Sequence, residues 1–212
     1  MHFIQIIIYC SLLFSTLAFA STDHTTNEKA ELLKINSNDK FLGNKNAKIV
    51  LIEYSSLACP HCADFHISIL PKIKEHYIDK DLLVYVHRNF PTNKPSLIAA
   101  MLASCSNNYF PFLNGLFLSQ ESWGYSVNFE KLLCNIAKLS SMEKSDFDKC
   151  LQDKELKDSM YNEAFKASKI LEINATPVFF LNGERIEGAV SYDSLATKIN
   201  SRIKLYNTIS NQ

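Results

Sequence analysis

Residues 49–66 read IVLIEYSSLACPHCADFH, a run that passes from aliphatic residues to a pair of cysteines. The continuous aliphatic stretch at 49–52 is typical of a strand that is buried on both faces. After the pair, apolar residues at helical spacing predict a helix that packs on this strand and that Pro71 should kink: Cys62, Phe65, Ile69 and Ile73. A second aliphatic run at 82–86 completes a strand, helix, strand unit with a right-handed crossover.

The rest of the chain predicts a helical block and one hairpin. Residues 95–171 have repeated amphipathic helical patterns and no convincing strand. Strand signal then returns for a hairpin that precedes a last helix: strands at 178–181 and from 185, a turn at Asn182-Gly183, and a helix at about 192–205. This order predicts an α/β fold in which residues 39–94 and 172–212 form a central mixed sheet flanked by helices, interrupted by an all-helical insertion at 95–171.

Length and composition exclude several classes of protein. The 212 residues can bury a sizeable core, and 47% of them are hydrophobic, which excludes a disordered or collagen-like chain. Lys and Arg total 22 and Asp and Glu also total 22, so the chain has no net charge with which to attract nucleic acid.

The first 20 residues have the pattern of a secretion signal. They contain no Lys, Arg, Asp or Glu, and they end in Ala18-Phe19-Ala20, which predicts cleavage after Ala20. A membrane anchor is the alternative, but the apolar run is short for a span. Export to the periplasm would place the remaining cysteines in an oxidising compartment, and the polar residues 21–38 are expected to be a flexible or loosely helical segment.

Each residue of the tetrapeptide Cys59-Pro60-His61-Cys62 has a physical role at the start of a helix. The unpaired N–H groups and the positive end of the helix dipole favour a thiolate at Cys59, which predicts an exposed nucleophile. Pro60 suits the first helical position, and His61 is expected to stabilise the Cys59 anion further. Cys62 lies one turn on, close enough to form a disulfide with Cys59 and to act as the resolving thiol.

A stabilised thiolate sets the direction of the reaction. One unit of pKa depression corresponds to about 1.4 kcal/mol, and for a two-electron couple that energy is about 30 mV. A thiol that is stabilised as the anion therefore makes its disulfide a better oxidant, which predicts a protein that donates disulfides.

A zinc or copper site is an alternative use of the same cysteines. His66 would be the third ligand, but the sequence contains no second CxxC or HxxxH to complete four ligands. His66 is interpreted as an ordinary surface residue of its helix, and His24, His76 and His87 are assigned no role. We expect neither a metal nor a dissociable cofactor.

Over residues 39–205 the chain resembles the DsbA family of thioredoxin-fold thiol-disulfide oxidoreductases. Residues 49–66 resemble that family's active-site segment, including its CPHC tetrapeptide, and residues 174–189 (NATPVFFLNGERIEGA) resemble its cis-proline segment. A helical insertion is also what this family adds to a plain thioredoxin domain. The resemblance implies a thioredoxin-like fold for the predicted mixed sheet.

The resemblance also implies roles for three further residues. A cis bond between Thr176 and Pro177 would turn the Thr176 backbone toward the cysteine pair and an extended substrate. Thr176 stands where strongly oxidising members carry valine, and it is more like isomerase and reductase relatives. Glu53 corresponds to an acidic residue beneath the active site, where a carboxyl group of raised pKa could shuttle the Cys62 proton; the alternative is a strand-end carboxylate that reaches solvent.

Three further cysteines leave an odd number, so at most one more disulfide can form. Cys105 and Cys150 lie on the apolar stripes of their helices, whereas Cys134 lies opposite its stripe. We predict a structural disulfide between Cys105 and Cys150, like one found in part of the family, and a reduced Cys134. Three reduced cysteines are the alternative.

The sequence therefore predicts a periplasmic, monomeric oxidoreductase that transfers the Cys59–Cys62 disulfide to reduced exported proteins. The resemblance implies reoxidation by a quinone-linked, DsbB-like membrane partner. A disulfide isomerase or reductase that uses the same pair is the first alternative, and an extracytoplasmic metal carrier is the second.

Overall fold

A computed structural model describes residues 26–210, so the predicted signal peptide at 1–20 lies outside the described residues. The strands are short and few: β1 (Lys40–Leu42), β2 (Ile49–Ser55), β3 (Leu83–Asn89), β4 (Val178–Leu181) and β5 (Glu184–Glu187). The first long helical segment runs without a break from Pro60 to Ile78 as α2 (Pro60–Asp64), η1 (Phe65–Ile69), α3 (Leu70–Ile73) and η2 (Lys74–Ile78), in which η1 and η2 are π-helical.

Seven helices follow: α4 (Lys94–Cys105), α5 (Tyr109–Leu118), α6 (Gln120–Trp123), α7 (Phe129–Leu139), α8 (Lys144–Gln152), α9 (Lys154–Ile170) and α10 (Tyr192–Ser210). Helices α4 to α9 lie between β3 and β4 in the sequence, which agrees with the helical block expected at 95–171. Within residues 26–210, none of the helices combines the length and the apolar character needed to cross a membrane.

The five strands form one mixed sheet in the order β1-β3-β2-β4-β5. Strands β2 and β3 are parallel, as the predicted crossover requires, and the other pairs are antiparallel. Strand β2 is central and buried along nearly its whole length, which explains its continuous aliphatic sequence. The sheet is the thioredoxin-like mixed sheet that the sequence predicted, and the three-residue edge strand β1 is an addition to it.

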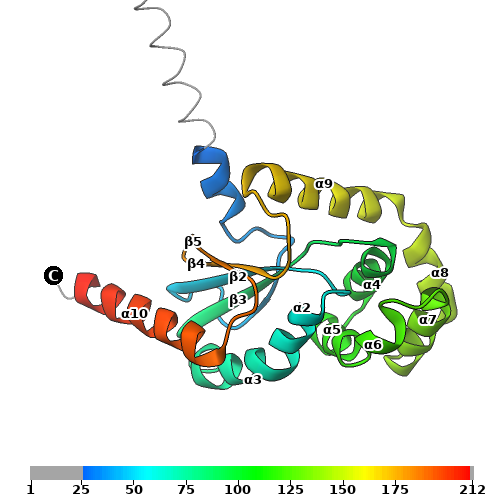
Figure 1. Cartoon of the computed structure of the whole chain (residues 1–212), viewed down its shortest axis with the longest axis horizontal. Helices are drawn as coiled ribbons and strands as arrows, with labels where there is room; N and C mark the ends of the chain where they lie inside the picture. Colours follow the sequence, from blue (N-terminus) through cyan, green and yellow to red (C-terminus); the bar gives the residue numbers. More distant parts are fainter. Residues whose placement is uncertain (1–25, 211–212) are drawn as a thin grey trace, which may run out of the picture.

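Helices cover both faces of the sheet (Figure 1). The face toward α3 and α10 packs residues such as Ile73 and Ile199 against Leu51 and Tyr85. The opposite face packs the end of α9 and the N-terminal segment against Ile52 and Val86 through Leu171 and Leu32. Helices α4 to α8 gather at one end of the sheet around a separate apolar cluster, which includes Trp123 and extends to Cys62.

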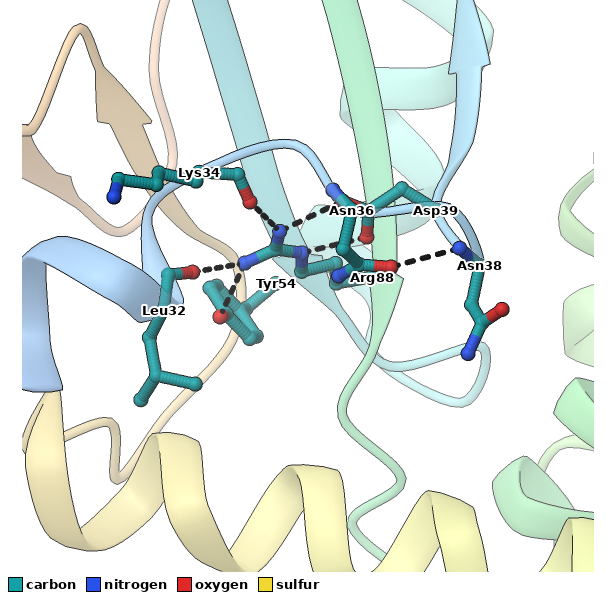
Figure 2. A network of polar contacts seen from close by, with 7 residues as sticks. All are labelled: Leu32, Lys34, Asn36, Asn38, Asp39, Tyr54 and Arg88. Carbon is teal, nitrogen blue, oxygen red and sulfur yellow. Dashed lines mark hydrogen bonds and ion pairs between the residues drawn. The ribbon is translucent and has the colours of Figure 1, made fainter.

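The described part of the N-terminal segment, for which a flexible or loosely helical chain is expected, begins at residue 26. Residues 26–32 are helical, and Arg88 of β3 holds the turn after them (Figure 2). The Arg88 guanidinium makes a two-pronged contact with Asp39, with both N–O distances 2.8 Å, and donates to the Lys34 carbonyl at 2.7 Å. It also donates to the Leu32 carbonyl and to the Tyr54 hydroxyl. A half-buried strand residue thus fixes a stretch whose own composition is typical of a loop.

Candidate active site

The cysteine pair lies where β2 leads into α2. Cys59 is the N-cap residue with an extended backbone (φ −90°, ψ 120°), and Pro60 occupies the first turn, as predicted. The Cys59 carbonyl accepts bonds from the N–H groups of Cys62 and Ala63, both at 3.1 Å, so the helix begins immediately after the first sulfur. This geometry leaves N–H groups of the first turn pointing toward the Cys59 side chain.

Cys59 is half-buried and lies against the loop before β4. Its Sγ lies 3.2 Å from the Thr176 carbonyl oxygen, to which the protonated thiol can donate, and the peptide bond between Thr176 and Pro177 is cis, as expected. Residues 117 positions apart in the sequence therefore meet at this sulfur.

The pKa of Cys59 is lowered to about 5. The largest cause is a hydrogen bond from the Cys62 thiol; partial burial opposes it, while contacts with Thr176 and the backbone N–H groups of Cys62 and His61 lower the pKa further. Cys59 is thus a thiolate at neutral pH. The His61 contribution comes through its backbone, because its side chain is exposed and approaches Asp64 at 3.7 Å.

Cys62 has the opposite environment. Its side chain is fully buried, and burial, the Cys59 sulfur and the charge of Glu53 together raise its pKa well above the ordinary value. Both cysteines are unbonded thiols in this structure. Two identical side chains one helical turn apart therefore have opposite preferences for their protons.

Glu53 lies beneath the pair and is completely buried. Its Oε2 accepts the Tyr85 hydroxyl and contacts His66 Nε2 at 3.0 Å. Burial raises the pKa of this carboxyl group, but the His66 charge and hydrogen bond, His87 and Tyr85 together lower it below the ordinary value. Burial agrees with the position expected for Glu53, whereas the expected rise in its pKa is wrong, because no pattern in the sequence indicated that His66 and His87 lie beside it.

His66 is also not the surface residue that was expected. It is 5% exposed, bonds to Glu53 and stacks on Phe117 with ring centroids 4.2 Å apart. The cause is local: residues Phe65–Ile69 form a π-helix, whose wider turn rotates side chains away from their α-helical directions. Pro71 lacks the N–H that would bond one turn back, which favours an interruption of the α-helix at this point.

His87, to which the sequence assigned no role, lies beside Glu53. It is paired with Glu53 in the register of β2 and β3, it is 2% exposed, and burial lowers its pKa to about 3. Its Nδ1 contacts the Tyr109 hydroxyl at 2.8 Å.

The helical block holds the loop that carries Cys59. The Gln120 amide donates to the carbonyls of Leu57 at 2.7 Å and Cys59 at 3.0 Å, and the Tyr125 hydroxyl donates to Ala58 at 3.3 Å. Gln120 is buried, and nothing in the sequence around it marked it as a functional residue.

A disulfide joins Cys105 at the end of α4 to Cys150 in α8, the pair predicted from helix faces. Cys134, in α7, is a free, half-buried thiol that packs against the same apolar cluster, also as predicted.

The metal alternative gains no support from the geometry. Within residues 26–210, no group of three or more His, Cys, Asp or Glu side chains is placed to hold a metal ion. His66, the proposed third ligand, is bonded to Glu53 instead.

Comparisons with known proteins agree with this geometry. A family model described as Thioredoxin matches residues 36–201. A Rickettsia bellii protein named as a protein-disulfide oxidoreductase is 35% identical over 81% of this chain and 67% of its own length, and a Rickettsia felis protein of the same description is 33% identical over 81% of this chain and 62% of its own length. The chain thus spans about two thirds of these relatives.

Two solved structures are also similar. Alpha-DsbA1 of Wolbachia pipientis has a TM-score of 0.80 and 35% identity, with 86% of this chain and 98% of that chain covered. BdbD from Bacillus subtilis has a TM-score of 0.70 at 23% identity, with 79% of this chain and 94% of that chain covered, a likeness of fold alone.

Proposed function

The chain belongs to the DsbA family of thioredoxin-fold thiol-disulfide oxidoreductases, and from that premise we propose that it donates the Cys59–Cys62 disulfide to pairs of cysteines in exported proteins. The contrast between the two sulfurs carries the proposal. Cys59 is accessible and has its pKa lowered to about 5, whereas Cys62 is buried with a raised pKa. This asymmetry stabilises the dithiol form, and a stabilised dithiol form makes the disulfide an oxidant.

The reaction is a pair of exchanges. A substrate thiolate attacks Cys59 Sγ, the Cys59–Cys62 bond breaks, and the bonding electrons leave on Cys62, which takes up a proton. A second substrate thiolate then attacks the substrate sulfur of the mixed disulfide and releases Cys59 as a thiolate. The substrate is oxidised by two electrons and the protein is reduced by two.

The Thr176 carbonyl supports binding of an extended substrate at this point. It lies 3.2 Å from Cys59 Sγ at the edge of the site, where main-chain groups of a peptide could pair with it. We further propose that the protein acts as a monomer in the periplasm after cleavage at Ala20, and that a quinone-linked, DsbB-like membrane protein reoxidises it.

A quenched assay of disulfide formation in a reduced, unfolded substrate protein tests the proposal. The oxidised wild type should introduce disulfides stoichiometrically, and Cys59→Ser should abolish transfer. Cys134→Ser is the matched control, because it removes a free thiol outside the site and should leave transfer unchanged. Transfer by Cys59→Ser at the wild-type rate would disprove the assignment.

Isomerase or reductase activity is the second candidate, and Thr176 in the loop that contacts Cys59 favours it. Reactivation of a scrambled substrate should be compared with oxidation of a simple dithiol. Efficient reactivation together with slow oxidation would support the isomerase, and the reverse would support the oxidase.

A further inference from the structure

Four buried polar atoms beneath the cysteine pair have no hydrogen-bond partner within the part of the chain that the structure describes. They are Glu53 Oε1, Ser55 Oγ, His87 Nε2 and Asn89 Oδ1. Buried polar groups in proteins are nearly always satisfied by protein or by ordered water. Four such atoms in one place therefore indicate a location where water is bound.

The register of the sheet brings these atoms together. Glu53 is paired with His87 and Ser55 with Asn89 on the parallel strands β2 and β3, so all four side chains point to the same face. Ser55 lies near enough to Cys62 to lower the pKa of that thiol, against the larger effect of burial. A continuous polar patch thus runs from the buried sulfur across two strands.

This patch extends to a cavity at the edge of the sheet that has neither Cys59 nor Thr176 among its lining residues. Strand β1 is paired with β3 only as far as His87, so the end of β3 is open beyond that point. A cavity of about 620 Å³ begins there, lined by His87 and Asn89, the N-terminal turn, and Ser104 of α4. Arg88 and Asp39, which are paired in Figure 2, form part of its wall.

His87 has the chemistry needed between the patch and the cavity. Burial keeps the ring neutral, and a neutral imidazole has one nitrogen that donates and one that accepts. The groups that face it are Glu53 of β2, His66 of η1 with ring centroids 5.4 Å apart, and Tyr109 of α5, whose ring lies near Lys40 of β1. Nε2 has no partner within residues 26–210, and Nδ1 contacts the Tyr109 hydroxyl, which lies 3.4 Å from the amide nitrogen of Asn89 at the cavity. A change of tautomer can therefore pass a proton between the Nε2 side and the Nδ1 side of the ring.

We propose that His87 relays the Cys62 proton between the Glu53–His66 pair and water in this sheet-edge cavity. Cys62 then exchanges its proton with solvent while a substrate covers the face at Cys59. The inference rests on the proposed function and adds to it a path for the Cys62 proton.

The proton balance is complete within this path. When a substrate thiolate attacks Cys59, the Cys59–Cys62 bond breaks and Cys62 leaves as a thiolate. It takes one proton from the Glu53–His66 pair, and the pair regains one proton from cavity water through His87. When the proposed membrane partner accepts the two electrons and reoxidises the protein, the same proton transfer runs in reverse.

The main test compares two reductants of the oxidised protein in single-turnover reactions. A peptide dithiol covers the Cys59 face, whereas dithiothreitol is small and leaves that face open to water. His87→Gln keeps a polar side chain but cannot relay by changing tautomer. We expect it to lower the peptide rate at least about tenfold relative to the dithiothreitol rate and to increase the solvent isotope effect of the peptide reaction.

An equilibrium measurement separates a relay from a structural role. A relay changes rates only, so the equilibrium of His87→Gln with glutathione should equal that of the wild type. A shift in that equilibrium, or an equal loss of both rates, would overturn the proposal.

A second variant tests the cavity without altering the relay. Ser104 lines the cavity and is half-buried, so Ser104→Phe should fill the space and lower the ratio of peptide to dithiothreitol rates in the same direction. Ser201→Phe is the control, because Ser201 is an exposed residue of α10. An unchanged ratio in Ser104→Phe would exclude this cavity as the outlet. A wild type that exchanges with neither reductant would instead refute the proposed function.

Discussion

The two cysteine pairs of this chain have contrasting environments. Cys59 and Cys62 are one helical turn apart, unbonded in this structure, and surrounded by groups that move their pKa values in opposite directions. Cys105 and Cys150 are 45 residues apart and bonded, and they join α4 to α8. The first pair is placed to exchange electrons, and the second is placed to close a loop.

The contrast shows that surroundings decide what a cysteine pair does. A helix start and the hydrogen bond from the neighbouring thiol favour a thiolate at the accessible Cys59, whereas burial and the Glu53 charge keep the proton on Cys62. Cys150 is buried in the apolar cluster of the helical block, and its bond to Cys105 joins the facing helices α4 and α8. The predictions that follow test each side of this contrast.

The largest expected effect is in exchange itself. Cys62→Ser leaves the Cys59 nucleophile but removes the resolving thiol, so mixed disulfides with substrate should accumulate and turnover should fall at least about a hundredfold. Non-reducing electrophoresis measures the trapped species after the Cys59 thiolate of the variant has attacked a disulfide-bonded substrate, which supplies the disulfide that is exchanged. Cys150→Ala should accumulate no mixed disulfide. Equal accumulation in both variants would show that the two cysteine pairs do not differ in exchange.

The second pair should instead affect stability. In the chain-entropy treatment, closing a loop of 45 residues contributes about 4 kcal/mol, so Cys105→Ala/Cys150→Ala should lower the free energy of unfolding by roughly that amount. Urea denaturation measures it, with Cys134→Ala as the control in the same helical block. The first exchange step should keep its wild-type rate; a large change in that rate would show that the two pairs are not independent.

Much of this contrast could be predicted from the sequence. The CPHC pair between a strand and a helix, the Cys105–Cys150 pairing and the Thr176-Pro177 loop follow from local patterns and from resemblance. The surroundings of Glu53 could not be predicted, because His66 turns inward only through the π-helix at Phe65–Ile69, and His87 arrives from the neighbouring strand. Strand β1 was missed because three exposed or half-exposed residues carry no periodic signal.

The next prediction concerns the buried groups under Cys62. His66→Leu removes the partner of the fully buried Glu53 carboxylate, and breaking a buried pair costs about 3 kcal/mol. Without His66 the Glu53 pKa would rise above its unfolded value, so the loss should be largest above that pKa and should shrink as the pH falls.

Denaturation at several pH values tests this dependence. Glu53→Leu/His66→Leu should recover most of the lost stability, because no buried charge remains. His76→Leu changes an exposed histidine and is the matched control. A loss that is independent of pH would show that packing against Phe117, not charge, accounts for the effect.

The lowered pKa of Cys59 predicts a smaller, pH-dependent effect on the reduced protein. The folded pKa is about 5 and the reference value is 9.0, so the stabilising contribution is complete above pH 9 and is lost as the pH falls through 5. After allowance for solvent screening of this half-exposed group, lowering the pH from 7 to 5 should remove about 1–2 kcal/mol. Unfolding of the reduced protein, compared with Cys59→Ser, measures it; parallel curves would contradict the thiolate.

The smallest expected effect concerns Gln120, which connects the helical block to the loop that carries Cys59. Gln120 belongs to the helical block that the Cys105–Cys150 disulfide closes, and its amide holds the carbonyls of Leu57 and Cys59. Gln120→Ala leaves two buried acceptors without this donor, which should cost about 1–2 kcal/mol of stability. The Cys59 pKa should change little, because Gln120 contacts the backbone and not the sulfur. Ultraviolet titration of the thiolate checks this: a pKa that returns toward 9 would mean that the helical block, rather than the first turn of α2, creates the reactive cysteine.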